Sequence, residues 1–129
     1  MGFKAMVPEI MASDFDKTID FYTSVLGFKV TNKAPPVGRP VWAELRCGDA
    51  VLMVLAREAM LSEYPSMKAR KPGATALFVL QAERRFVEEF ARKNSGNAAI
   101  VRPLQHTDYG STEIAIADPD GYVVLLSGR

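Results

Sequence analysis

The order of local patterns occurs twice along this chain, and that repetition limits the possible folds more than any other feature. Each half gives a strand, a helix and three more strands. Phe21 and Gly27, at the end of the first helical stretch, recur as Phe90 and Gly96 with the same offset of 69 residues. Chance spacing of common residues is the competing explanation, but an internal repeat of this kind predicts tandem structural modules.

We therefore predict a single α+β domain over residues 1–129, built from two tandem βαβββ modules. The modules cover about 3–56 and 74–128. The stretch REAMLSEYPSMKARKPG between them, residues 57–73, contains one weak helical turn, Pro65 and Pro72-Gly73, which is typical of a linker.

The first helix has clear boundary signals. Ser13 or Asp14 is a suitable N-cap, and Gly27 provides the left-handed stop. Between them, apolar residues recur every three or four positions and predict one buried face: Phe15, Ile19, Tyr22 and Leu26. The second helix is predicted over 83–96, with Phe86 and Phe90 on one side.

Alternating or continuous apolar segments between turn residues predict the strands. They cover residues 3–12, 28–32, 41–47, 50–56, 74–81, 97–104, 111–117 and 122–127.

Composition narrows the class of protein. The 129 residues carry 16 basic and 15 acidic side chains in a mixed order, so the sequence predicts no nucleic-acid partner. A single cysteine, Cys47, excludes an internal disulfide and fits a reducing compartment. The first residues lack the long apolar run of a secretory signal, and no segment approaches the roughly 18 apolar residues of a membrane helix. We expect a soluble cytoplasmic domain without a membrane partner.

Two long stretches resemble one known family. VPEIMASDFDKTIDFYTSVLGFKV is similar to the opening strand, helix and second strand of the vicinal oxygen chelate superfamily, and YGSTEIAIADPDGYVVLLS is similar to its closing hairpin. That superfamily includes glyoxalase I, extradiol dioxygenases, fosfomycin-resistance enzymes and bleomycin-resistance binding proteins. The resemblance implies two modules that form a curved mixed sheet around a cavity, and a homodimer.

The metalloenzymes of that superfamily place ligands on the first and fourth strand of each module. The resemblance carries these positions to Val7, Met53, Ala74 (or Thr75) and Leu125, and none of them is His, Glu or Asp. Divalent cations need three or more converging nitrogen, thiolate or oxygen ligands. We therefore expect neither a bound metal nor another cofactor. The DPDG turn before Leu125 is retained because it sets the hairpin.

Strand alternation then predicts which side chains line the cavity. An apolar cup with Trp42 as a flat plate and several carboxylates suits a flat, partly cationic organic molecule. The expected ligand-binding residues are Val7, Glu9, Met11, Trp42, Glu44, Met53, Leu55, Tyr109, Glu113 and Leu125.

Each of these residues also has a structural interpretation. A structural role for Trp42, in the core or at a dimer contact, is as well supported as a ligand contact, and the methionines suit the core. Glu9 would form an ion pair with Arg46 or Arg102. His106, which we place in a polar loop, is either a proton shuttle with Asp108 and Tyr109 or a solvated side chain.

Three functions follow. The first is a metal-free protein that sequesters a small organic compound, as antibiotic-resistance proteins of the superfamily do. Bleomycin itself is weakly supported. Bleomycin-type ligands are cationic, so a dedicated binder should be strongly acidic, whereas the net charge of this chain is +1. The second is a metal-independent lyase or isomerase that uses Glu9 or Glu44 with Tyr109 or His106 as acid and base. The third is a protein interface. No catalytic residue is assigned.

Overall fold

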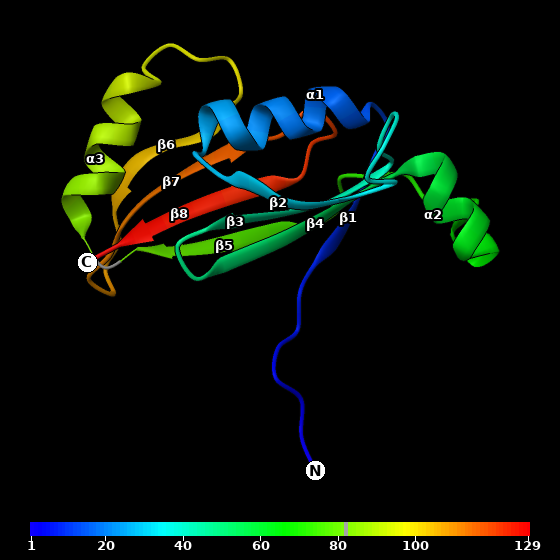
Figure 1. The fold of residues 1–129 in the computed structure, drawn as a ribbon. Coiled ribbons are helices and arrows are strands. Elements are labelled where there is room, and N and C mark those ends of the chain that lie inside the picture. Colours follow the sequence, from blue (N-terminus) through cyan, green and yellow to red (C-terminus); the bar gives the residue numbers. More distant parts are fainter. Residues whose placement is uncertain (82) are drawn as a thin grey trace. The chain divides into compact units, whose positions relative to one another are not determined.

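A computed structural model of the chain describes residues 1–81 and 83–129. It divides into two units, Met1–Pro72 and Gly73–Arg129, each with its own four-stranded mixed sheet (Figure 1). The described residues of each unit follow the strand–helix–strand–strand–strand order, so the α+β class is confirmed. Within these residues we find no helix with the length and apolar character needed to cross a membrane.

The sheet of the first unit has the order β1-β4-β3-β2, with β1 and β4 parallel and the other pairs antiparallel. Its strand β1 begins at Glu9 instead of residue 3, because Pro8 has no N–H to contribute to the ladder and offers only its carbonyl, to Met53. The bounds are β1 Glu9–Ala12, β2 Lys29–Ala34, β3 Trp42–Cys47 and β4 Ala50–Ala56.

The helix α1, Phe15–Asp20, starts as expected: the Asp14 carboxylate accepts a hydrogen bond from the Lys17 N–H at 3.1 Å. It continues into a π-helical turn, η1, over Phe21–Val25. A π turn holds more residues than an α turn and shifts the phase of the side chains. Thr18 and Tyr22 are the most buried here, whereas Phe15, Ile19 and Leu26 are only half-buried. The predicted buried face was therefore wrong in part.

The predicted linker contains regular structure. Helix α2, Arg57–Glu63, and a 3₁₀ turn, η2, over Pro65–Met67 belong to the first unit. Met60 is 4% exposed and packs with Met11 and Leu55 of the sheet, and this burial explains why the segment is helical. A short segment with one buried anchor gives a weak sequence pattern, so the sequence indicated only a single turn.

The sheet of the second unit has the order β5-β8-β7-β6, again with one parallel pair, β5 and β8. Helix α3, Arg84–Lys93, covers one face of it through Val87 and Phe90 (Figure 1). Phe86 lies one turn before Phe90 but is 45% exposed, so the buried contact with the sheet is made by Val87 and Phe90. The strands are β5 Ala76–Gln81, β6 Ile100–His106, β7 Thr112–Ala117 and β8 Val123–Gly128.

The two sheets also share a pattern at their edges. The register of β2 against β3 shifts between Val30 and Asn32. The register of β6 against β7 shifts twice, around Arg102. The parallel edge strands β1 and β5 pair without any such shift. Each sheet therefore has one bulged edge strand and one regular edge strand.

The DPDG turn is fixed by its first residue. The Asp118 side chain is buried, and its Oδ1 accepts hydrogen bonds from the backbone N–H groups of Asp120, at 2.9 Å, and Tyr122, at 3.0 Å. Gly121 has φ +91, a conformation that favours glycine. The strand β8 that follows therefore enters the sheet at a defined residue.

Asp118→Ala should lower the free energy of unfolding by about 1–2 kcal/mol, because the buried N–H of Tyr122 and the partly buried N–H of Asp120 lose their acceptor. Asp118→Asn keeps an oxygen at the same place and should cost much less. Urea denaturation followed by circular dichroism measures both variants. Equal losses in the two variants would show that the carboxylate charge, and not its acceptor geometry, holds the turn.

Candidate functional site

Most residues predicted from the first module lie together on one face of its sheet. Residues paired directly across neighbouring strands share a face. One row across the sheet is Glu9, Met53, Glu44 and Asn32; the next is Met11, Leu55, Trp42 and Ala34. We call these eight residues the Trp42 face. Val7 is half-buried just before β1.

The apolar part of the Trp42 face is packed against α2. Met11, Leu55 and Met60 form a buried cluster, and the half-buried Trp42 lies against it. The alternative that Met11 and Trp42 are core residues therefore holds in part, since Met11 belongs to this buried cluster and Trp42 packs against it. Trp42 nevertheless keeps part of its surface open, as a stacking residue must.

The polar part of the Trp42 face has one carboxylate with partners and one without. Glu44 Oε1 accepts hydrogen bonds from Thr31 Oγ1 at 2.8 Å and from Arg46 Nε at 3.2 Å. The hydrogen bond from Thr31, and then that from Arg46, lower the pKa of Glu44 below its usual value. Glu9 is half-buried, and we find no ion pair or hydrogen bond of its side chain among the described residues. The expected pairing of Glu9 with Arg46 was wrong, because Arg46 pairs with Glu44 on its own strand. Arg102, in the second unit, pairs with Glu113 on the neighbouring strand.

In the second unit, the face away from α3 carries two corresponding rows. The first is Phe78, Leu125, Ala115 and Arg102; the second is Leu80, Ser127, Glu113 and Gln105. We call this the Arg102 face. Leu125 is buried at 6% exposure, whereas Phe78 and Leu80 on the edge strand β5 are 67% and 79% exposed.

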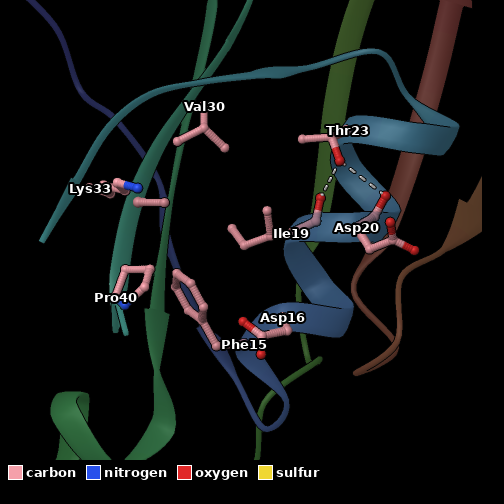
Figure 2. Close-up of a pocket in the computed structure, with 9 residues that line it drawn as sticks. Phe15, Asp16, Ile19, Asp20, Thr23, Val30, Lys33 and Pro40 are labelled. Carbon is pink, nitrogen blue, oxygen red and sulfur yellow. Dashed lines mark hydrogen bonds between the residues drawn. The ribbon is translucent and has the colours of Figure 1, made fainter. Parts of the chain in front are cut away.

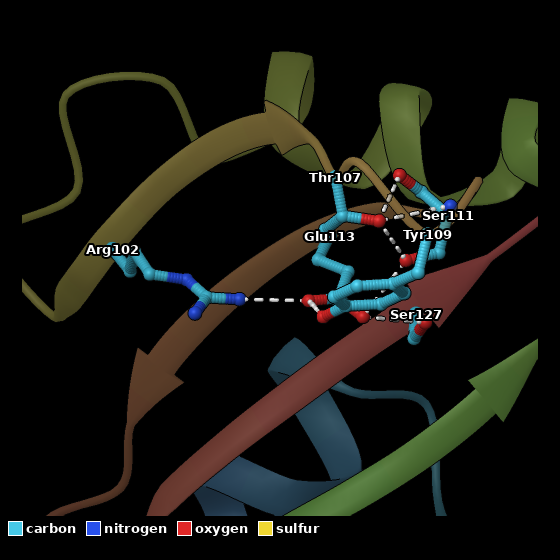
Figure 3. A network of polar contacts seen from close by, with 6 residues as sticks. All are labelled: Arg102, Thr107, Tyr109, Ser111, Glu113 and Ser127. Carbon is cyan, nitrogen blue, oxygen red and sulfur yellow. Dashed lines mark hydrogen bonds and ion pairs between the residues drawn. The ribbon is translucent and has the colours of Figure 1, made fainter.

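Glu113 is the centre of a polar network on the Arg102 face (Figure 3). Its Oε1 accepts from Arg102 Nη2 and Tyr109 Oη, both at 2.9 Å. Its Oε2 accepts from Ser111 Oγ at 3.0 Å and Ser127 Oγ at 2.9 Å. A carboxylate offers about four lone-pair sites, so this one has no acceptor site left. Glu113 therefore organises its neighbours and is not free to contact a ligand as the sequence predicted.

The ionisation of this network follows from the same contacts. Burial by itself would raise the pKa of Glu113, but the hydrogen bonds from Ser127, Tyr109, Ser111 and Arg102 together hold it below its usual value. The hydrogen bond to Glu113 in turn raises the pKa of the Tyr109 phenol. Glu113 is thus a stable anion and Tyr109 a weak acid at neutral pH.

The suggested proton shuttle is not assembled. His106 ends strand β6 instead of lying in a loop, and its Nδ1 lies 2.8 Å from Thr112 Oγ1. Thr112 is paired with Gly128, on the sheet face that α3 covers. Tyr109 binds Glu113 on the opposite face, so the two predicted partners use different sides of β7.

A hollow that the sequence did not indicate lies on the other face of the first sheet, between α1 and strands β2 and β3 (Figure 2). Its volume is about 390 Å³. Asp16 at its rim pairs with the exposed Arg39 at 3.0 Å, and Asp20 accepts from Ser24 Oγ. The lining residues are Phe15, Asp16, Ile19, Asp20, Thr23, Val30, Lys33, Pro40 and Ala43.

Comparison with known proteins decides the family. A family model described as the Glyoxalase/Bleomycin resistance protein/Dioxygenase superfamily matches residues 5–126. The chain belongs to this superfamily. A search of curated proteins found no match.

Several solved structures share the fold of this chain at low sequence identity. TioX from Micromonospora sp. ML1 is 23% identical with a TM-score of 0.72, covering 98% of this chain and 96% of its own. A lactoylglutathione lyase from Agrobacterium tumefaciens is 18% identical with a TM-score of 0.74, covering 99% and 96%. A protein of unknown function from A. tumefaciens str. C58 is 15% identical with a TM-score of 0.79, covering 100% and 96%.

A metal site of the glyoxalase-superfamily type does not fit the side chains present. The strand positions that the resemblance points to carry Val7, Met53, Ala74 (or Thr75) and Leu125, and none of these offers a histidine nitrogen or a carboxylate oxygen. Beside Met53, Glu44 is already held by a guanidinium, so Glu9 is left as a single carboxylate. Within the described part of the chain, no three His, Cys, Asp or Glu side chains lie close enough together to hold an ion.

Proposed function

We propose that this glyoxalase-superfamily chain binds and sequesters a small organic molecule without the help of a metal. The ligand is flat and partly cationic, and it binds on the Trp42 face. The observation that carries the proposal is the adjacency of two rows: Glu9, Met53 and Glu44 lie beside Met11, Leu55 and Trp42. An aromatic plate and a carboxylate that forms no ion pair with a basic residue of the first unit are thereby neighbours.

The chemistry of this face favours an aromatic cation. A ring stacked on Trp42 gains about 0.5–1.5 kcal/mol beyond its burial, and a cation over an indole gains a comparable amount. The thioethers of Met11 and Met53 adapt to irregular shapes. Glu9 supplies the negative charge locally, which matters because the whole chain is close to neutral.

The alternative function, a metal-independent lyase or isomerase, receives less support. A catalytic acid and base must reach the same substrate atom with pKa values near the working pH. Hydrogen bonds raise the pKa of Tyr109 and lower the pKa of Glu44, away from neutrality in both cases. His106 binds Thr112 on the α3 side of the second sheet.

The expected homodimer stays a prediction that analytical ultracentrifugation would test.

The test uses the fluorescence of Trp42, the single tryptophan. We expect 1-methylquinolinium, a flat aromatic cation, to quench it saturably, and quinoline, its neutral counterpart, to bind about tenfold more weakly, a difference of about 1.4 kcal/mol. Glu9→Gln should remove this preference. Glu58→Gln, an exposed carboxylate on α2, should retain it as the matched control.

Two outcomes would contradict the proposal. Quenching that rises linearly with the cation concentration, without saturation, would mean collision instead of binding. Binding that a chelator abolishes would mean that a metal ion holds the ligand. Calorimetry with Trp42→Ala completes the test, because loss of the tryptophan should weaken both quinoline compounds.

A further inference from the structure

The hollow between α1 and the strands β2 and β3 has an apolar floor and charged rims (Figure 2). Its volume of about 390 Å³ lies within the range of roughly 300–1,000 Å³ that is usual for small-molecule sites. Ala43 is small and lies in the floor, so it leaves space between the helix and the strands. The other floor residues are Phe15, Ile19, Val30 and Pro40. This face of the first sheet is opposite to the Trp42 face, because Ala43 and Trp42 are consecutive in β3.

A bulge in β2 brings a lysine to this hollow. Lys33 is paired with Ala43, so it lies on the helix side of the sheet. Val30 is paired with Leu45, two residues from Ala43, and therefore lies on the same side. In a regular strand, positions 30 and 33 would face opposite sides, but the register shift between them removes this alternation. The Lys33 ammonium has no ion pair among the described residues, so its charge is open to a ligand.

The rim on the helix side, across the hollow from Lys33, is acidic (Figure 2). Asp16 and Asp20 lie one turn apart on α1 and both line the hollow. Asp16 is already paired with Arg39 at 3.0 Å. Asp20 forms no ion pair within the part of the chain that the structure describes. Asp20 is therefore the carboxylate that can hold a cation here.

Two hydroxyl groups prepare this rim for a hydrogen-bond donor. Ser24 Oγ donates to Asp20 Oδ1 at 3.1 Å, which fixes the carboxylate and leaves its other oxygen open. Thr23 Oγ1 donates to the Ile19 carbonyl at 2.8 Å, so the hydroxyl oxygen keeps its own acceptor capacity. Thr23 also lines the hollow. An ammonium group, which has three donors and no acceptor, suits this pair of acceptors.

We infer that the hollow binds a zwitterion with an apolar body, whose ammonium contacts Asp20 and Thr23 and whose carboxylate contacts Lys33. A simple amine would meet the like charge of Lys33, and a simple acid would meet the like charge of Asp20. A molecule with the two charges at opposite ends satisfies both rims, and its apolar body covers the floor. This inference goes beyond the proposed function, because the site lies on the other face of the same sheet.

The experiment uses trans-4-(aminomethyl)cyclohexane-1-carboxylate, a zwitterion whose saturated ring cannot stack on an indole. Its two controls each lack one charge: trans-4-methylcyclohexane-1-carboxylate and trans-4-methylcyclohexylmethylamine. Isothermal titration calorimetry should show that the zwitterion binds about fivefold more tightly than either control, a modest gain because both rims are exposed. The gain should shrink at high salt.

Single substitutions identify the two charged contacts. Asp20→Asn should remove the advantage of the zwitterion over the acid, and Lys33→Met should remove its advantage over the amine. Lys29→Met, which removes an exposed lysine from the same strand but outside the hollow, is the matched control and should change neither. Val30→Ser makes the floor polar and should weaken all three compounds alike. Thermal melts check that each variant is folded.

Two results would overturn the inference. The first is that the zwitterion binds no better than its controls, or binds as well to both Asp20→Asn and Lys33→Met. The second is that Trp42→Ala weakens the zwitterion, which would place it on the Trp42 face. The quinolinium measurement is separate: if quinolinium binds and the zwitterion does not, this inference fails and the proposed function stands, and the reverse result refutes only the proposed function.

Discussion

Glu113→Ala should destabilise the protein by about 3 kcal/mol, the largest loss that we expect from a single substitution on the two faces. The alanine leaves Ser111 and Ser127 without the acceptor that they share and removes the partner of Arg102. Removing one member of a buried ion pair typically costs about 3–5 kcal/mol. We expect a value at the lower end, because Arg102 is 40% exposed and can be solvated.

Glu113→Gln is the matched control. It keeps the shape and one acceptor oxygen, but its amide nitrogen faces two donors, so its loss should be smaller than that of alanine and still measurable. Guanidinium denaturation at neutral pH gives both values. A loss below about 1 kcal/mol for Glu113→Ala would show that water replaces the carboxylate at little cost.

The same network predicts a pH dependence with a definite sign. The pKa of Glu113 is lowered in the folded protein relative to its usual 4.5. The folded state therefore binds fewer protons than the unfolded state between the two pKa values, and stability rises with pH there. This contribution is complete above pH about 4.5 and is lost as the pH falls through the folded pKa. The stability advantage of the natural protein over Glu113→Gln should shrink on acidification.

Gly128→Ala should cost about 2 kcal/mol through steric overlap and not through backbone strain. A Cβ at this position would lie 2.8 Å from the Glu83 carbonyl oxygen and 2.9 Å from Val87 Cγ2. Helix α3 is packed directly on the strand here, so it would have to move away from the sheet. Overpacking of this kind costs about 1–3 kcal/mol.

A double-mutant cycle tests this explanation. Val87→Ala creates a cavity under α3 and is itself destabilising, but it removes one of the two groups that the new methyl would strike. Gly128→Ala should therefore cost less in the Val87→Ala background, by about 0.5 kcal/mol or more. Strictly additive losses in thermal or chemical unfolding would mean that α3 does not obstruct the added methyl.

Features encoded by neighbouring residues were predictable from the sequence. The strand Ala50–Ala56 has the predicted bounds, and Asp14 caps the first helix. Turn glycines such as Gly27 have the expected positive φ. Each of these depends on local patterns: a run of apolar residues between turns, a side chain that can accept from N3, or a residue without a Cβ.

Features that depend on distant partners were not predictable. The π turn after Asp20 changes which helix face is buried, and no residue type encodes it directly. Arg102 reaches Glu113 because it is paired with Ala115, which lies two residues from Glu113 on the same strand. The two register shifts in β6 on either side of Arg102 set this pairing. Strand alternation alone identified Glu113 as facing away from the helix, but could not show that four donors surround it.

The register shifts in the edge strands β2 and β6 affect how readily another chain can pair with these strands. A regular, exposed strand edge is a template for pairing with another chain, and a bulge or a proline interrupts the ladder that such pairing needs. β2 carries a bulge and two lysines, Lys29 and Lys33, and β6 carries two register shifts and Pro103. Both antiparallel edges are therefore poor templates. Strand addition from another molecule, whether in ordered assembly or in misfolding, is therefore expected at β5, which pairs regularly and exposes Phe78 and Leu80, and not at β1, whose residues Ile10, Met11 and Ala12 are buried.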